Sequence, residues 1–252
     1  MSLDRVAVVT GAGSGIGAAS ARRLAADGFK LWCLDLRLDA AEASASTISN
    51  AAAHAVDVGD EASVSEAFDT ILRSDGAIDV LVNSAGIIVN SRFDETAVRD
   101  WERTYRINVI GTYLCMVAAL PGLRAAASPS RIVNIASAAG KLPGMYTVSY
   151  NASKAAVISL TRSAAVALAP DILVNSVCPG VIDTPMWDQQ RVGLARIGAG
   201  PGTTFEERVA ALPIKRPGSA EDVAEVVAFL AGPGGSYMLG EDINVNGGLA
   251  LH

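Results

Sequence analysis

Short apolar runs rich in β-branched residues recur along this chain and alternate with longer amphipathic stretches. Runs of roughly four to eight apolar residues favour buried strands, whereas a 3.6-residue period favours helices. The runs predict strands at residues 6–9, 31–34, 53–56, 80–82, 132–135, 173–177 and 243–245. Helices are expected between them, for example over residues 16–27, 60–74 and 148–169.

This alternation predicts an α/β fold in which a seven-stranded parallel sheet carries helices on both faces. Hydrophobic residues make up 50% of the 252-residue chain and aromatic residues only 5%, so the core should be aliphatic. That length suits one α/β domain. The 24 glycines and 10 prolines are spread along the chain, and we find no repeat. We expect one domain over residues 1–252, with its ligand beyond the carboxyl ends of the strands.

Charge and cysteine content narrow the functional classes. The net charge is −6 and lysines and arginines form no stripe, which argues against a nucleic-acid partner. No apolar run is long enough to predict a membrane span, and residues 1–5 lack a secretory signal pattern. The separated cysteines Cys33, Cys115 and Cys178 indicate buried thiols in a reducing, cytoplasmic setting. No Cys/His spacing suggests a metal site.

A glycine-rich turn, TGAGSGIG, follows the first predicted strand and precedes a helix. Glycine permits a tight turn and close approach of a ligand to the backbone. The helix start offers free N–H groups and a positive dipole end to a pyrophosphate. The turn therefore predicts a dinucleotide site, although such turns can also serve only to pack a helix. The expected contacts are Gly11, Ser14, Gly15, Ile16 and Gly17.

Asp35 ends the second predicted strand, eighteen residues after Gly17. A carboxylate at about this distance accepts hydrogen bonds from a ribose 2′-hydroxyl and repels a 2′-phosphate. NAD is therefore favoured over NADP. Arg37 is a counterweight, because a basic side chain nearby can accept a phosphate.

The ends of the later strands carry small or polar residues. Asp57-Val58 follows the third, where the carboxylate can accept from an adenine amino group or instead cap the next helix. Small residues beside the other strand ends leave room for a ribose or ring, and the expected cofactor contacts there are Asn83, Ala85, Gly86, Pro179, Gly180 and Thr184.

Tyr150 and Lys154 are four residues apart, which places them on one face of a helix. A lysine ammonium near a phenol favours the phenolate and lowers its pKa. Such a tyrosine can exchange a proton with a substrate oxygen. The spacing alone also arises by chance between two unrelated surface residues.

The ordered set of these motifs resembles the short-chain dehydrogenase/reductase family over nearly the whole chain. The resemblance rests on the glycine turn, Asp57-Val58, the Asn83-Ser84-Ala85-Gly86 segment, Asn108, Ser137, Tyr150 with Lys154, and Pro179-Gly180 with Thr184. Ser137 precedes Tyr150 by 13 residues, as in that family. Ser84 departs from it, because a second asparagine is more common there.

The resemblance implies a doubly wound Rossmann fold and a role for each matching position. Tyr150 would be the acid/base, and Lys154 would lower its pKa and hold the nicotinamide ribose. Ser137 would bind the substrate oxygen, and Asn108 would support a proton relay through water to Lys154. Taken singly, Ser137 and Asn108 are equally explained as a strand-end serine and a buried amide. A Ser-His-Asp hydrolase is disfavoured, because the histidines are His54 and the terminal His252.

Residues 183–212 form a long insertion after the sixth strand, interrupted by the Gly198-Ala199-Gly200-Pro201-Gly202 run. We interpret it as a substrate lid of two short helices, with a static surface excursion as the alternative. Met186 and Trp187 are the expected substrate contacts. This segment resembles those of diol and polyol dehydrogenases and acetoin reductases, which favours a small secondary alcohol, diol or polyol as substrate. No cluster of basic residues for an acidic substrate is evident, and Arg191 and Arg196 fit a solvated helix face.

Two other functions compete with an NAD-dependent alcohol or diol dehydrogenase. One is a 3-oxoacyl-carrier-protein or other carbonyl reductase using NAD(P)H. The other, a non-catalytic dinucleotide sensor, would not need the proposed catalytic residues. The tail Leu249-Ala250-Leu251 is apolar, so we expect it to be buried in a partner subunit, with burial within its own subunit as the alternative. The resemblance to the family implies a homotetramer.

Overall fold

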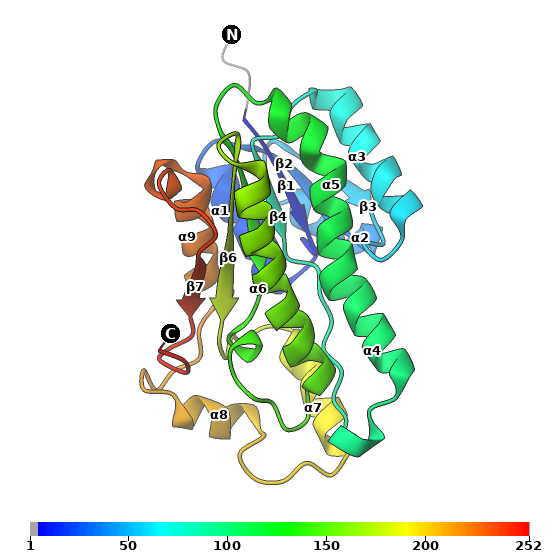
Figure 1. Ribbon diagram of the computed structural model, residues 1–252, viewed down its shortest axis with the longest axis vertical. Helices are drawn as coiled ribbons and strands as arrows, with labels where there is room; N and C mark the ends of the chain where they lie inside the picture. Colours follow the sequence, from blue (N-terminus) through cyan, green and yellow to red (C-terminus); the bar gives the residue numbers. More distant parts are fainter. Residues whose placement is uncertain (1–4, 252) are drawn as a thin grey trace.

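One parallel sheet runs through the centre of the molecule, and the computed structural model describes it within residues 5–251 (Figure 1). The strands are β1 (Val6–Thr10), β2 (Lys30–Asp35), β3 (Ala51–Ala55), β4 (Val80–Asn83), β5 (Ser130–Ile135), β6 (Ile172–Pro179) and β7 (Asp242–Val245). Their order across the sheet is β3-β2-β1-β4-β5-β6-β7, and every pairing is parallel. The predicted seven-stranded, doubly wound α/β fold is confirmed.

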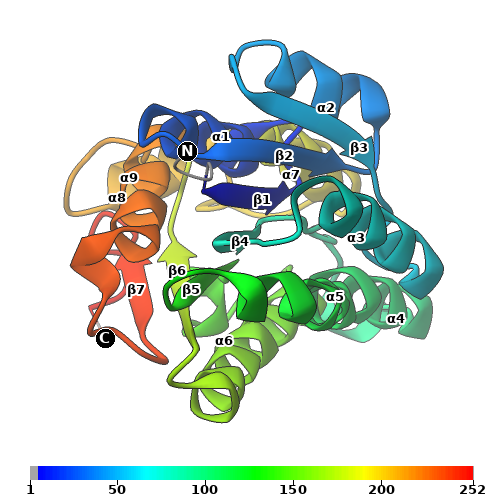
Figure 2. The ribbon, with the colours of Figure 1, turned by 90° about the horizontal axis from the view of Figure 1, so that it is seen from above.

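Helices cover both faces of the sheet (Figure 2). One layer contains α1 (Gly15–Ala26), α2 (Leu38–Ala45) and α9 (Ala220–Ala231). The opposite layer contains α3 (Glu61–Asp75), α4 (Val98–Tyr105), α5 (Gly111–Ala125) and α6 (Val148–Leu168). Two further helices, α7 (Met186–Arg196) and α8 (Phe205–Ala211), lie beyond the carboxyl ends of the strands (Figure 1).

Most of the core lies in two largely aliphatic clusters, one on each face of the sheet. Buried side chains of β1 alternate between them, so that Val8 packs toward α3 and α5 while Val9 packs toward α1 and α9. This alternation follows from the two-residue period of a strand. Both faces are apolar, which explains why the strands read as continuous hydrophobic runs.

The third strand differs in its limits from the sequence prediction. It spans Ala51–Ala55 rather than residues 53–56, because Ala51 and Ala52 pair with Leu31 and Trp32 of β2. Alanine carries little strand preference of its own, so pairing with β2 decides where this edge strand begins.

A continuous helix of 28 residues, Val98–Ala125, contradicts the expectation that no segment reaches membrane-spanning length. The helix is long enough and apolar enough to cross a membrane, judged by length and composition only. Of its most apolar segment, 44% is buried inside the protein. Cys115, Ala119 and Leu123 pack into the core on one face of the sheet. Packing on the sheet therefore accounts for the apolar character of the face of the helix that carries these residues.

The strand order reverses direction between β1 and β4, which are neighbours in the sheet but not in the chain. The connections on the two sides of this point leave toward opposite faces. A crevice opens there, beyond the carboxyl ends of the strands.

Candidate active site

The turn between β1 and α1 is rich in glycine because backbone packs on backbone there. Gly11 and Gly15 have positive φ angles of 65° and 52°, which favour glycine. A Cβ atom on Gly17 would lie 2.1 Å from the carbonyl oxygen of Gly11. Ser14 and Ile16 line the adjoining cleft together with these glycines. The tight turn therefore brings the start of α1 to the cleft, where helical N–H groups suit an anionic ligand.

Asp35 is joined to this turn. Its Oδ2 atom accepts a hydrogen bond of 2.9 Å from the amide of Gly13, and its Oδ1 atom accepts one of 3.1 Å from the amide of Arg37. A Cβ atom on Gly13 would lie 2.7 Å from Oδ2, so only glycine allows this approach. The carboxylate is thus fixed at the cleft, while the Arg37 side chain at the same strand end is exposed.

Asp57 lines the cleft after β3, and the alternative that it caps the next helix is wrong. Its Oδ1 atom accepts from the amide of Gly59 at 2.8 Å. The cap of α3 is Asp60, which accepts from the amides of Ala62 and Ser63. Asp57 therefore shapes the turn at the border of the cleft. Val58, also in the cleft lining, is largely buried.

The end of β4 is tied to the end of β1. Thr10 Oγ1 accepts from the amides of Ser84 and Ala85, both at 3.2 Å. Ala85 and Gly86 then line the cleft, as expected. Asn83 differs from its neighbours, because its side chain is buried and donates to Asn134 Oδ1 at 2.9 Å. Its amide joins β4 to β5 beneath the cleft.

Asn108 sits in a π-helical turn, Arg106–Ile110, that joins α4 to α5. Such turns often mark functional positions in long helices. The side chain is fully buried, and it donates to Ser153 Oγ at 3.0 Å as well as contacting Ile87. A Cβ atom on Gly86 would lie 3.3 Å from Asn108 Oδ1 and 3.6 Å from Lys154 Nζ. Asn108 and Lys154 therefore approach the same glycine from two helices.

The first turns of α6 carry Tyr150 and Lys154, and Ser137 follows β5. All three side chains line the cleft and are largely buried. Lys154 Nζ donates to the carbonyl of Ile135 at 2.7 Å and lies 5.8 Å from the centroid of the Tyr150 ring. Ser137 Oγ accepts from the amide of Ala139 at 3.1 Å. The fold thus brings the three predicted residues to one place.

The expected lowering of the Tyr150 pKa is not found. Burial raises the pKa of the Tyr150 phenol, and a hydrogen bond with Ser137 opposes the rise. Burial lowers the pKa of Lys154 to about 8. Loss of solvation penalises the charged form of each group, and it is the largest cause of both shifts.

The loop after β6 completes the floor of the cleft. Gly180 lies against Asn246, where a Cβ atom would approach the Asn246 Cα atom to 2.7 Å. Thr184 faces the glycine turn, and its Cγ2 atom lies 3.3 Å from where a Cβ of Gly15 would be. Pro179, Gly180 and Thr184 all line the cleft, as the sequence predicted.

The resulting cleft has a volume of about 920 Å³. It runs from Asp35 and Asp57 at the ends of β2 and β3 to Tyr150 and Trp187 near α6 and α7. Of the predicted site residues, Asn83 and Asn108 do not line it. The glycine turn, the small strand-end residues and the carboxylate of Asp35 form a cradle that fits an extended dinucleotide.

The segment expected to be a lid contains α7 and α8, which pack on each other. Trp187 meets Phe205 edge to face, with ring centroids 5.1 Å apart. Trp187, Val181 and Leu212 form a small buried cluster separate from the two sheet clusters. Met186 and Trp187 line the cleft. Trp187 therefore holds the two helices together as well as bounding the cleft.

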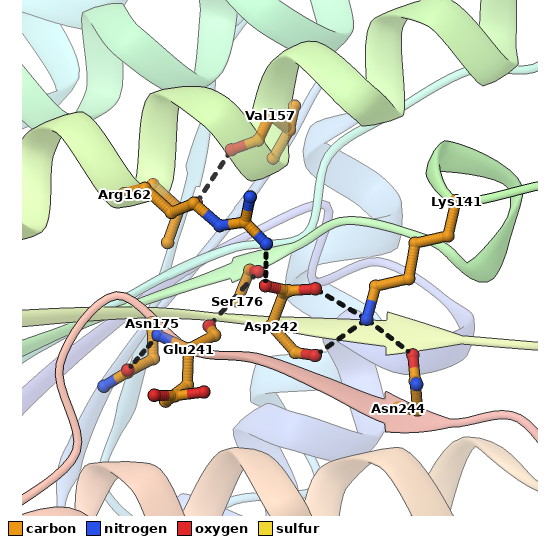
Figure 3. A network of polar contacts seen from close by, with 9 residues as sticks. Lys141, Val157, Arg162, Asn175, Ser176, Glu241, Asp242 and Asn244 are labelled. Atoms are coloured by element: carbon orange, nitrogen blue, oxygen red, sulfur yellow. Dashed lines mark hydrogen bonds and ion pairs between the residues drawn. The ribbon is translucent and has the colours of Figure 1, made fainter. Parts of the chain in front are cut away.

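A polar network joins the loop after β5 to α6 and β7 (Figure 3). Lys141 Nζ lies 2.6 Å from Asp242 Oδ2 and donates to Asn244 Oδ1 at 2.9 Å. Arg162 of α6 contacts Asp242 Oδ1 at 2.5 Å. Asp242, at the start of β7, thus connects the loop that follows Ser137 to the helix that carries Tyr150.

Sequence reasoning missed several polar residues of the site. Asn151 Nδ2 donates to the carbonyl of Leu142 at 2.8 Å, and Asn151 Oδ1 accepts from Thr147 at 2.7 Å. Arg208 of α8 also lines the cleft. Asn151 could have been predicted, because it directly follows Tyr150 in the sequence. Arg208 could not, because only the packing of α8 brings it to the cleft.

Known proteins that are similar to this chain include dehydrogenases and reductases. The family model described as "Enoyl-(Acyl carrier protein) reductase" matches residues 11–250. Sorbitol dehydrogenase of Cereibacter sphaeroides is 37% identical, with 98% of each chain covered. The 3-oxoacyl-[acyl-carrier-protein] reductase FabG of Aquifex aeolicus is 36% identical, with 97% of each chain covered. The structure of a variant of actinorhodin polyketide ketoreductase with NADPH has a TM-score of 0.92 and 31% identity, covering 99% of this chain and 98% of that one.

Proposed function

Because the chain belongs to the short-chain dehydrogenase/reductase family, we propose that it uses NAD to oxidise a secondary alcohol, diol or polyol and to reduce the matching ketone. The chain is an oxidoreductase of the alcohol and polyol dehydrogenase type. The observation that carries the proposal is the convergence of Ser137, Tyr150 and Lys154 on the cleft that also holds the glycine turn and Asp35.

The cofactor fit rests on the shape of the cleft. At Gly11, Gly17 and Gly180 a Cβ atom would meet neighbouring backbone, so glycine permits the close packing that brings the start of α1 and the loop after β6 to the cleft. Gly11, Ser14, Gly15, Ile16 and Gly17 would hold the phosphates, since backbone N–H groups at a helix start bind anions. When bound, the nicotinamide dinucleotide accepts or supplies the hydride.

We propose that Tyr150 exchanges the proton with the substrate oxygen. Ser137 would donate to that oxygen and hold it against the phenol, where negative charge develops as the proton moves. Lys154 is protonated below a pKa of about 8. Its positive charge would stabilise the phenolate form of Tyr150 once the proton has left, and its Nζ atom would also bind ribose hydroxyls.

Asn108 would act by position. Its side chain already makes hydrogen bonds to Ile87 and Ser153, so it is held in one orientation. We propose that it fixes the segment around Gly86 beside Lys154 and so supports the proton path from Lys154.

The preference for NAD is assigned to Asp35. Its fixed carboxylate would accept from the ribose hydroxyls and repel a 2′-phosphate. Asp57, Val58, Ala85 and Gly86 would border the adenosine half, with the backbone of Asn83 behind them. Arg37, whose exposed side chain also lines this end of the cleft, is the residue that would favour a 2′-phosphate instead.

Three further properties belong to this proposal. Residues 183–212 act as a substrate lid, in which Met186 and Trp187 contact the substrate. The enzyme is a cytoplasmic homotetramer, and it binds neither nucleic acid nor membrane. Leu249 is 40% exposed and Leu251 82% exposed, while Ala250 is largely buried, so two apolar residues of the tail remain for a partner subunit. His252 lies outside the described residues. Light scattering coupled to size-exclusion chromatography would test the tetramer.

The alternative is a carbonyl or 3-oxoacyl-carrier-protein reductase, which the FabG relative supports. The same three side chains serve both directions. The deciding experiment monitors nicotinamide absorbance with NAD and NADP against alcohols, diols, polyols and hydroxy acids, and with NADH and NADPH against ketones and 3-oxoacyl thioesters. Turnover restricted to thioesters would favour the reductase, and dinucleotide binding without any turnover would favour a sensor.

A further inference from the structure

Arg208 is a basic side chain in the lining of the cleft. It lies on α8, and its guanidinium carbon is 5.7 Å from the centroid of the Trp187 ring. Trp187, Met186 and Gln190 of α7 line the same part of the cleft. Arg208 therefore borders the half of the cleft in which a substrate would lie, on the side formed by the lid segment.

The guanidinium group of Arg208 lacks the partners that a buried arginine usually has. Its Nε atom is buried and has no hydrogen-bond partner. Within residues 5–251, Arg208 forms no ion pair, whereas five other arginines do: Arg22, Arg23, Arg162, Arg191 and Arg216. Burial lowers the pKa of Arg208, yet a guanidinium remains charged at neutral pH.

Arg131 provides a comparison within the same chain. Burial also lowers its pKa and leaves its Nε atom unpaired, but its terminal nitrogen donates to the backbone carbonyls of Pro129 and Ser130. Within residues 5–251, the guanidinium group of Arg208 contacts the face of Trp187 and no hydrogen-bond acceptor. A partly buried, charged group without a hydrogen-bonded partner is costly, which favours a partner that arrives with a ligand.

The charges that line the cleft are distributed unevenly. The acidic side chains in the lining are Asp35 and Asp57, which follow β2 and β3 in the half expected to hold adenosine. Near α6, α7 and α8 the charged lining residues are Lys154 and Arg208. Within the described part of the chain, the substrate half of the cleft is therefore positive, and its remaining polar residues are neutral.

We propose that Arg208 binds a carboxylate of the substrate, so that the preferred substrate is a secondary hydroxy acid, or the matching oxo acid, rather than a neutral diol. This inference rests on the proposed function and specifies its substrate class. The planar guanidinium matches a carboxylate through two parallel hydrogen bonds. Stacking on Trp187 would hold the group in place for that contact.

The test compares hydroxy acids of increasing length with their neutral primary amides, using the wild-type enzyme and the variants Arg208→Gln and Arg208→Lys. The wild type should favour the acid over its amide. Arg208→Gln should lower kcat/KM for the acid about 10- to 100-fold, mainly through KM, and leave the amide within about twofold. Arg208→Lys should recover part of the loss.

Binding measurements distinguish a contact of Arg208 with the substrate from a contact with the cofactor. Fluorescence titration with NAD should give the same Kd for all variants, because a lower affinity would mean that Arg208 contacts a cofactor phosphate instead. Arg191→Gln, which alters an exposed arginine of α7, serves as the matched control.

Equal losses for acid and amide would overturn the inference and leave Arg208 a packing residue. A wild type that turns over amides and diols as well as acids would overturn it too, while leaving the proposed function intact. Absence of all nicotinamide-linked turnover would instead overturn the proposed function. Should Arg208→Gln fail to fold, the acid-to-amide ratio of the wild type and of Arg208→Lys decides.

Discussion

Asn108 holds both backbone groups of Ile87: its Oδ1 atom accepts from the Ile87 amide at 2.8 Å, and its Nδ2 atom donates to the Ile87 carbonyl at 2.9 Å. A single buried amide thereby replaces the ladder bonds that this segment loses beyond the end of β4. This contact agrees with the alternative interpretation of Asn108, in which its amide satisfies buried backbone groups. Gly86, next to Ile87, lies beside Lys154, so the same contact also fixes one wall of the site.

Asn108→Ala should reduce both stability and turnover. Two buried backbone groups would lose their partners, so the free energy of unfolding should fall by about 2–4 kcal/mol, measured by urea denaturation. Asn175→Ala is the matched control, because Asn175 makes an equivalent pair of contacts to Met238 and Glu241 away from the cleft. If both variants lost stability, and if the loss of activity per folded molecule were the same in both, Asn108 would have no special role in the site.

Tyr150→Phe should abolish turnover while NAD still binds. The variant keeps the ring and loses the hydroxyl that exchanges the proton, so kcat should fall by at least about 10³-fold. Stopped-flow or steady-state absorbance gives kcat, and fluorescence titration gives the Kd for NAD. Tyr146→Phe, a nearby residue outside the cleft lining, is the control. Substantial activity in Tyr150→Phe would remove Tyr150 from the mechanism.

Asp35→Ala should weaken NAD binding and relax discrimination against NADP. The variant removes both the acceptor for the ribose hydroxyls and the negative charge that repels a 2′-phosphate. We expect the ratio of kcat/KM for NAD to that for NADP to fall by about 10- to 100-fold. Asp39→Ala, on the exposed start of α2, should leave this ratio unchanged. An unaltered ratio in Asp35→Ala would show that another residue reads the ribose.

Lys154→Met should change how stability depends on pH. Burial lowers the pKa of Lys154 from 10.5 to about 8. Between these values the unfolded state binds more protons than the folded state, so the free energy of unfolding of the wild type should rise with pH. The gain relative to Lys154→Met should approach about 3 kcal/mol across the window. Urea denaturation without cofactor at several pH values measures it, and parallel curves would contradict the lowered pKa.

Asp242→Asn should destabilise the network that Asp242 forms with Lys141 and Arg162. Burial alone raises the pKa of the Asp242 carboxyl, but Lys141 and Arg162 outweigh it and hold the pKa below its usual value. The stabilisation is therefore present above the unfolded pKa and is lost as pH falls through the folded one. We expect a loss of about 1–2 kcal/mol at neutral pH that shrinks under acid conditions.

The control for this variant is Asp188→Asn, because the exposed Asp188–Arg191 pair should contribute less than about 0.5 kcal/mol. Thermal denaturation at neutral and acidic pH would compare the two. Equal effects at both pH values would mean that the charge of Asp242 does not stabilise the network.

The sequence predicted the sheet because each strand is a buried apolar run, and it placed Asp35 and Ser137 because each lies where a strand ends. It misplaced the start of β3, whose alanines carry no strand signal. It placed Asn83 at the cofactor, whereas pairing between β4 and β5 turns that side chain toward Asn134. It missed Arg208, because the packing of Trp187 against Phe205 that positions α8 depends on contacts distant from any motif.

The small cluster of Trp187, Val181 and Leu212 has a consequence for protein engineering. Because α7 and α8 share an apolar cluster of their own, residues 183–212 can be exchanged as one block without changing the two apolar clusters that pack on the sheet. A graft from a relative with another specificity should then adopt the donor's preference, and it should keep dinucleotide affinity where Thr184, a proposed cofactor contact within the block, is retained. Diversification by such exchange needs few compensating changes, provided that Val181 and Leu212 at the two junctions are retained.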